Sequence, residues 1–211
     1  MSQQHKLPEF PAQPFGLLLV EGGDERFACE NIAGPATWAN LVCWNQHGRD
    51  DLPKLAGLAK LAPNFHHARS IGLVLDVEDD LSKALDLASR TLAVFGATGT
   101  PAHGVISAGS PRVGMFLSPD GVSAGSIETL CRRAVRDAAL AACVDALVGC
   151  AGYPHASRRN AQVAADKGWI NAYLSMQPDP TLRFHQAFST AGGIDPTHPT
   201  FDPLRAFLTG L

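Results

Sequence analysis

Acidic residues gather directly after two apolar runs of the sequence. The first run, residues 70–75 (SIGLVL), is followed by four acids: Asp76, Glu78, Asp79 and Asp80. The second run, residues 15–20 (FGLLLV), leads directly into Glu21. An apolar run without alternation is typical of a buried parallel strand, and ligands of open α/β sheets bind beyond the carboxyl ends of the strands. The two runs therefore predict one shared acidic site.

The spacing of these acids suits a divalent cation. Ions such as Mg²⁺ take oxygen ligands, usually one or two carboxylates together with water or phosphate oxygens. In extended backbone the side chains at i and i+2 project to the same side, so Asp76 and Glu78 can share one ion. Glu21 can add a third ligand or act as a general acid or base, and Asp80 is an outer candidate ligand. Clustered carboxylates repel one another unless a cation or a proton is present, which favours Mg²⁺, or Mn²⁺ in its place.

Several of these acids also have a structural interpretation. Asp79 and Asp80 stand where a following helix needs an N-cap, which Asp provides well. Glu21 alone is equally compatible with a solvated loop position. The combination of acids after two strands, rather than any single one, favours the metal site.

The composition is that of one globular domain. The chain has 211 residues, 45% of them hydrophobic, and a net charge of −3. It contains no basic block that predicts a nucleic-acid tail, no stretch approaching the roughly 18 apolar residues of a membrane span, and no zinc-type or P-loop motif. Five cysteines without a C-x-x-C pair predict reduced thiols and a cytoplasmic location.

Hydrophobic periodicity predicts strands alternating with helices in the first half of the chain. Residues 1–14 are expected to form a flexible tail, and 15–211 a single domain with an α/β core over 15–120 and a mostly helical elaboration over 121–211. Strands are predicted at 15–20, 38–44, 70–75, 103–107 and 112–117, the last two as a hairpin. Helices are predicted at 24–32, 50–62, 81–95, 126–137, 139–150, 158–176 and 203–209, with Gly34-Pro35 ending the first.

Five short motifs occur in an order that resembles a known family. They are LLVEGGD at 18–24, VLDVE at 74–78, VGMFLSPD at 113–120, GSIE at 125–128, and Lys167 followed by YLSMQ at 173–177. The first two resemble a Toprim domain, the metal-binding catalytic module of topoisomerases, primases and some nucleases and repair proteins. More narrowly, the whole set resembles DUF3226, a bacterial family of uncharacterised Toprim-like proteins.

The resemblance implies a Toprim-like α/β fold with a mainly parallel central sheet flanked by helices. It implies that Glu21 is the general acid/base or a metal ligand, that Asp76 and Glu78 bind Mg²⁺, and that Glu128 serves a second metal. Asp120 is a further candidate ligand, or alternatively a Pro-Asp-Gly turn residue. Lys167 is a candidate phosphate-binding residue, or alternatively a solvated surface lysine.

Two functions follow as hypotheses. One is Mg²⁺-dependent, nuclease-like chemistry on the phosphodiester bonds of nucleic acid. The other is a catalytically degenerate binding or regulatory module that works with a partner protein such as an ATPase. The second is favoured by Glu78, which stands where the Toprim pattern has Asp, and by Gly23, where relatives often carry Lys.

Overall fold

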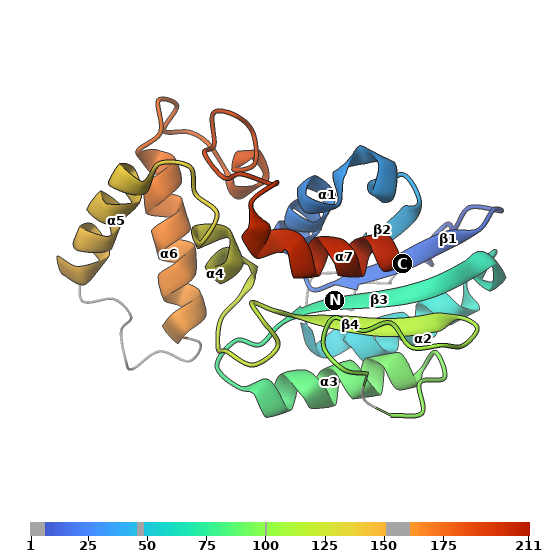
Figure 1. Cartoon of the computed structure of the whole chain (residues 1–211). Coiled ribbons are helices and arrows are strands. Elements are labelled where there is room, and N and C mark those ends of the chain that lie inside the picture. The colour runs from blue at the N-terminus through green and yellow to red at the C-terminus, as the bar shows by residue number, and fades with distance from the viewer. Residues whose placement is uncertain (1–6, 46–48, 100, 151–160) are drawn as a thin grey trace, which may run out of the picture.

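The computed structural model of the chain describes residues 7–45, 49–99, 101–150 and 161–211. Four strands form the central sheet: β1 (Phe15–Val20), β2 (Leu41–Asn45), β3 (Ala68–Asp76) and β4 (Arg112–Ser118). Seven α-helices accompany them in the described part: α1 (Gly23–Trp38), α2 (Leu52–Leu61), α3 (Leu81–Ala93), α4 (Ile127–Arg132), α5 (Ala138–Cys150), α6 (Ala161–Ser175) and α7 (Asp202–Gly210). Figure 1 shows their arrangement.

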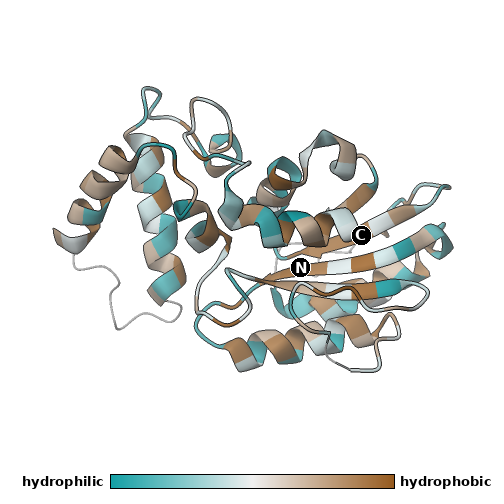
Figure 2. Cartoon of the chain, in the orientation of Figure 1, coloured by the Kyte–Doolittle hydropathy of each residue, from teal (hydrophilic) through white to brown (hydrophobic). Residues whose placement is uncertain are grey.

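The sheet is parallel throughout, with the strand order β2-β1-β3-β4. Because β1 and β3 are buried on both faces, their sequences are apolar without alternation, as expected for central parallel strands. The predicted α/β class with a parallel sheet flanked by helices is therefore confirmed. The strands form the hydrophobic centre between the helical layers (Figure 2).

Two cores lie on opposite faces of the sheet. Alternate residues of β1 point into different cores. Leu18 and Val20 pack with α1, α4, α6 and α7, whereas Leu17 and Leu19 pack with α2 and α3. The period of two along a strand requires this division. Helices α4, α5 and α6 lie beyond the carboxyl ends of the strands, on the left of Figure 1. This helical segment therefore stands next to the edge where the acids were predicted.

The predicted strand at 103–107 is wrong, and so is the hairpin that it was to form. Only isolated bridges occur there, from His103 to Met115 in parallel sense and from Ile106 to Gly114 in antiparallel sense. Gly104 between them has a φ of 71°, which breaks the extended conformation. Strand β4 instead pairs in parallel with β3.

The predicted end of the first helix also needs correction. Gly34, with a φ of 73°, interrupts the helix, but helical turns resume immediately and α1 continues to Trp38. Pro35 is compatible with this restart, because the first turn of a helix does not use its backbone N–H. Pro35 therefore begins a new helical stretch after the kink.

Part of the predicted N-terminal tail is packed against the domain. Phe10 is 5% exposed, its ring lies 5.2 Å from that of Phe15, and its carbonyl accepts a hydrogen bond of 3.0 Å from Asn64. Residues 1–6 lie outside the described part of the chain. All five cysteines are free, with Cys143 and Cys150 exposed. No described helix is long and apolar enough to cross a membrane.

Candidate acidic site

Glu21 and Asp76 lie side by side at the switch point of the sheet. Strand β1 connects through α1 to β2 on one side, while its other neighbour is β3, which leads through α3 to β4. Such a reversal leaves a crevice at the carboxyl ends of the two central strands. Glu21 follows β1, Asp76 ends β3, and the backbone N–H of Asp76 donates a hydrogen bond of 3.0 Å to Oε1 of Glu21.

Two further carboxylates join this pair. Oδ1 of Asp76 accepts a hydrogen bond of 2.9 Å from the backbone N–H of Ile127, the first residue of α4. The next residue, Glu128, is 2% exposed, and its Oε2 has no hydrogen-bond partner. Glu25, in the first turn of α1, is 5% exposed. The acidic site defined here therefore consists of Glu21, Glu25, Asp76 and Glu128.

Burial and mutual repulsion dominate the electrostatics of this acidic site. Burial first, and then the charges of Glu25, Glu21 and Glu128, raise the pKa of Asp76 well above its usual value. Burial raises the pKa of Glu21 to about 7, although Arg49 opposes the shift. Burial also raises the pKa of Glu25, and the charge of Glu128 adds to this effect. The site therefore favours the uptake of protons or of a cation.

Two basic side chains border the acidic site. Arg49, in a short 3-10 turn before α2, lies 2.9 Å from Oε2 of Glu78 and 3.7 Å from Oε1 of Glu21. Lys167 on α6 lies 3.3 Å from Oε1 of Glu128. Burial alone would lower the pKa of Lys167, but Glu128 and Glu25 outweigh it and the pKa is raised. Both cations line an open pocket of about 290 Å³ together with Glu21, Asp24 and Glu25.

Glu78 takes a conformation that the sequence pattern does not predict. Its φ is 57°, in the left-handed region that residues other than Gly, Asn and Asp rarely adopt. The backbone is held there by Gly125, because Glu78 and Gly125 exchange two backbone hydrogen bonds of 2.8 and 2.7 Å. The extended geometry that would point Asp76 and Glu78 to one side is therefore absent, and Glu78 contacts Arg49 instead.

Asp80 is a helix cap and Asp120 is a turn residue, the structural alternatives to a role as metal ligands. Asp80 is the N-cap of α3, where Oδ1 accepts from the N–H of Lys83. Its hydrogen bonds with Lys83 and Ser82 lower its pKa to about 2. Asp120 accepts from the backbone of two following residues, at 3.2 and 2.7 Å, in a turn beyond β4. None of these hydrogen bonds connects Asp80 or Asp120 with Glu21 or Asp76.

The acidic site suits a hard cation in its chemistry more than in its present geometry. Within the residues that the structure describes, no three His, Cys, Asp or Glu side chains converge closely enough to hold a metal ion as they stand. One oxygen of Glu21 and one of Asp76 are engaged by backbone N–H groups. The donors are nevertheless all oxygens, and Oε2 of buried Glu128 has no partner. Oxygen atoms of this kind are the ligands that hard divalent cations take in proteins.

Sequence reasoning missed Glu25 and Arg49. An acid in the first turn of a helix is usually explained by the helix dipole, so Glu25 gave no distinct signal. Its separation of four residues from Glu21, with two glycines between them, was the available clue. Arg49 stands alone in a polar connection, and nothing local indicates that it reaches two carboxylates.

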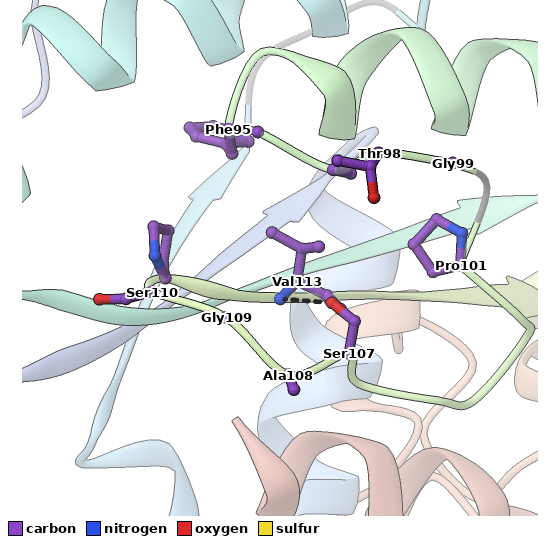
Figure 3. A pocket seen from close by; sticks show the side chains of 12 residues that line it. Phe95, Thr98, Gly99, Pro101, Ser107, Ala108, Gly109, Ser110 and Val113 are labelled. Carbon is purple, nitrogen blue, oxygen red and sulfur yellow. Dashed lines mark hydrogen bonds between the residues drawn. The ribbon is translucent and has the colours of Figure 1, made fainter.

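A larger pocket of about 450 Å³ lies at the opposite edge of the sheet, next to the start of β4 (Figure 3). Loop residues 96–99 and 107–111 line much of it, and Ser107 accepts a hydrogen bond of 3.4 Å from the N–H of Val113. None of the twelve described residues that line this pocket carries a charge. The described lining of this pocket therefore offers no charged side chain that could act together with the acidic site.

Comparison with protein families gives one result. The model of DUF3226, described as a protein of unknown function, matches residues 16–211. The chain belongs to the DUF3226 family. The match includes Glu21 and Asp76, as well as α4 and α6. Neither curated proteins nor solved structures gave a match to this DUF3226 member.

Proposed function

We propose that this DUF3226 protein is a Toprim-like, Mg²⁺-dependent enzyme that cleaves phosphodiester bonds of nucleic acid, with Mn²⁺ as a possible substitute ion. The observation that carries the proposal is the meeting of Glu21, Asp76 and Glu128 at the switch point of the sheet. They come from three separate segments, and their burial together has no evident benefit for stability. Groups of this kind are typical of functional sites.

The residues of the acidic site have distinct roles in this proposal. Asp76 and Glu128 would hold the cation, which supplies Lewis-acid stabilisation of the phosphate and an activated water. Glu21, with a pKa raised to about 7, can accept or donate a proton near neutral pH and is the proposed general acid/base. Glu25 would share the metal with them. We leave Glu78 out of the proposed ligand set, because its left-handed backbone lacks the extended geometry in which it would share an ion with Asp76.

The basic residues of the site would bind the substrate. Lys167 and Arg49 both line the pocket that contains Glu21 and Glu25. When a cation takes over the carboxylates, the two side chains can turn to phosphate oxygens, for which Arg offers a planar pair of donors and Lys a point charge.

Cleavage assays test this function. Single- and double-stranded DNA and RNA should be incubated with the protein and Mg²⁺ or Mn²⁺, and compared with Glu21→Gln, Asp76→Asn and the control Asp202→Asn. Asp202 is an exposed acid on α7 that pairs with Arg205. We expect Mg²⁺-dependent cleavage that survives in the control and falls at least about 100-fold in the two site variants. Cleavage that persists in Asp76→Asn would contradict the proposal.

A second function is favoured by the ion pairs of the site. Arg49 and Lys167 already place positive charge beside Glu21, Glu78 and Glu128. Internal cations can take the place of a metal, and the protein would then be a binding or regulatory module, working with a partner such as an ATPase. This function would be supported over the enzymatic one by two results: no cleavage with either metal ion, and an affinity of Asp76→Asn for the partner equal to that of the wild type.

A further inference from the structure

A buried carboxylate on α6 lies close to the acidic site but is not part of it. Asp166 is 1% exposed and lies on α6, which packs against α4. Its Oδ2 accepts hydrogen bonds from Oγ1 of Thr129 and, at 3.1 Å, from Nε2 of Gln162. Arg132 lies 3.5 Å from its other oxygen. A carboxylate so deeply buried requires such partners, because its charge is costly to bury without them.

Thr129 connects Asp166 to the backbone at the start of α4 through a second hydrogen bond. A hydroxyl has one proton to donate and lone pairs to accept with. Because Thr129 donates its proton to Asp166, Oγ1 presents lone pairs to the backbone N–H of Ser126, which it accepts at 2.9 Å. Gly125 leaves the space for this arrangement, since a Cβ there would lie 2.5 Å from Oγ1 of Thr129.

The peptide groups held in this way contact the acidic site directly. The N–H next along the chain, that of Ile127, donates to Oδ1 of Asp76 at 2.9 Å. On the other side, Gly125 exchanges two backbone hydrogen bonds with Glu78. Residues 125–129 are thus fixed between α6 and the end of β3, and their position determines where the Asp76 carboxylate points.

We infer that Asp166 and Thr129 are positioning residues, which orient the first peptide groups of α4 so that Ile127 holds the carboxylate of Asp76. A neighbouring contact supports the same role for α6, because Lys167 pairs with Glu128 just as Asp166 pairs with Thr129. Two consecutive residues of α6 therefore bind two consecutive residues of α4. The arrangement corresponds to the outer hydrogen bonds that orient carboxylate ligands in metal sites.

Amide hydrogen exchange of the metal-free full chain tests this inference. Thr129→Val keeps the side-chain shape and removes the hydroxyl, Thr129→Ser restores the hydroxyl, and Asp166→Leu removes the carboxylate. The control is Asp145→Asn, which disturbs the neighbouring bonds to Arg132 and Trp169 but not Thr129. We expect exchange at Ser126 and Ile127 to accelerate about tenfold in Thr129→Val and Asp166→Leu, with Thr129→Ser and the control near wild type.

Exchange at Val74 in β3 separates positioning from general loss of stability. If the amides of Ser126, Ile127 and Val74 all accelerate together, or if none does, the positioning role is overturned. A second measurement, which rests on the proposed function, is Mg²⁺ affinity by calorimetry. Thr129→Val should weaken it about tenfold, and Thr129→Ser should recover it. Absence of Mg²⁺ binding by the wild type would refute the proposed function, while the exchange result would still decide the positioning role.

Discussion

The backbone N–H of Asp76 donates a hydrogen bond of 3.0 Å to the carboxylate of Glu21, although 55 residues separate the two in sequence. The bond joins the ends of the two central strands at the point where the order of the sheet reverses. It places the half-buried carboxyl group of Glu21 beside the buried one of Asp76, in a setting that raises the pKa of both. The consequences of this arrangement can be measured in the metal-free protein as well as in the presence of Mg²⁺.

Replacing Asp76 should stabilise the metal-free chain. Asp76→Asn keeps the shape of the side chain and removes a charge that burial and three neighbouring carboxylates disfavour. We expect the free energy of unfolding at pH 8 with chelator to rise by on the order of 1–2 kcal/mol. Urea unfolding measures the change, with Asp202→Asn as the control, which loses only an exposed ion pair and should be destabilised by less than about 1 kcal/mol. A loss of stability in Asp76→Asn would show that repulsion is not the dominant interaction at this residue.

The metal-free chain should lose stability as the pH rises through the range of Glu21. Burial raises the pKa of this carboxyl from its ordinary 4.5 to about 7 in the folded chain. The folded state therefore binds the proton more tightly, and its advantage is complete below about pH 4.5 and lost as the pH passes 7. The shift corresponds to about 3 kcal/mol. Unfolding titrations between these limits should show this slope in the wild type, and a flatter curve in Glu21→Gln.

The positive charge of Arg49 should weaken Mg²⁺ binding at the acidic site. It lies 2.9 Å from Glu78 and 3.7 Å from Glu21, so its charge opposes the entry of another cation. We expect Arg49→Gln to bind Mg²⁺ roughly fivefold more tightly, while Arg205→Gln, on α7, leaves the affinity unchanged. Unchanged affinity in Arg49→Gln would mean that this arginine moves away at no cost when the ion binds. Cleavage should nevertheless decrease, since Arg49 is a proposed phosphate ligand.

Glu78 should store backbone strain that glycine relieves. Its φ of 57° is unfavourable for a side chain with a Cβ, and its carboxylate is partly exposed. Glu78→Gly and Glu78→Ala lose the same ion pair with Arg49, but only glycine tolerates the left-handed conformation freely. Thermal and urea unfolding should find Glu78→Gly more stable than Glu78→Ala by about 1 kcal/mol. Equal stability of the two variants would argue against strain at this position.

The central sheet was predictable because its physical cause is local in sequence. Residues 15–20 and 70–75 are apolar without alternation, and parallel strands buried on both faces require such runs. The prediction for segment 103–107 is wrong because the β-branched pair Val105-Ile106 resembles the centre of a short strand. The left-handed Gly104 that breaks this segment is visible only in the folded chain.

The candidate site was predictable in its location and only in part in its members. Glu21 and Asp76 follow directly from strand ends, and Glu128 came from the family resemblance. The contact of Glu78 with Arg49 depends on a left-handed backbone fixed by Gly125, 47 residues further along. The hydrogen bond that Thr129 donates to Asp166 depends on how α6 packs on α4. Long-range packing of this kind leaves no pattern in the sequence of either segment.

Calorimetric titration of Mg²⁺ into the wild type and Asp76→Asn tests the central claim most directly. The account predicts a saturable heat at millimolar Mg²⁺ for the wild type, an affinity that rises with pH as the carboxyl groups lose their protons, and no such heat for Asp76→Asn. Titration of Mn²⁺ should give the same pattern. No heat in the wild type at millimolar ion, or an equal heat in Asp76→Asn, would contradict a metal site built on Asp76 and Glu128.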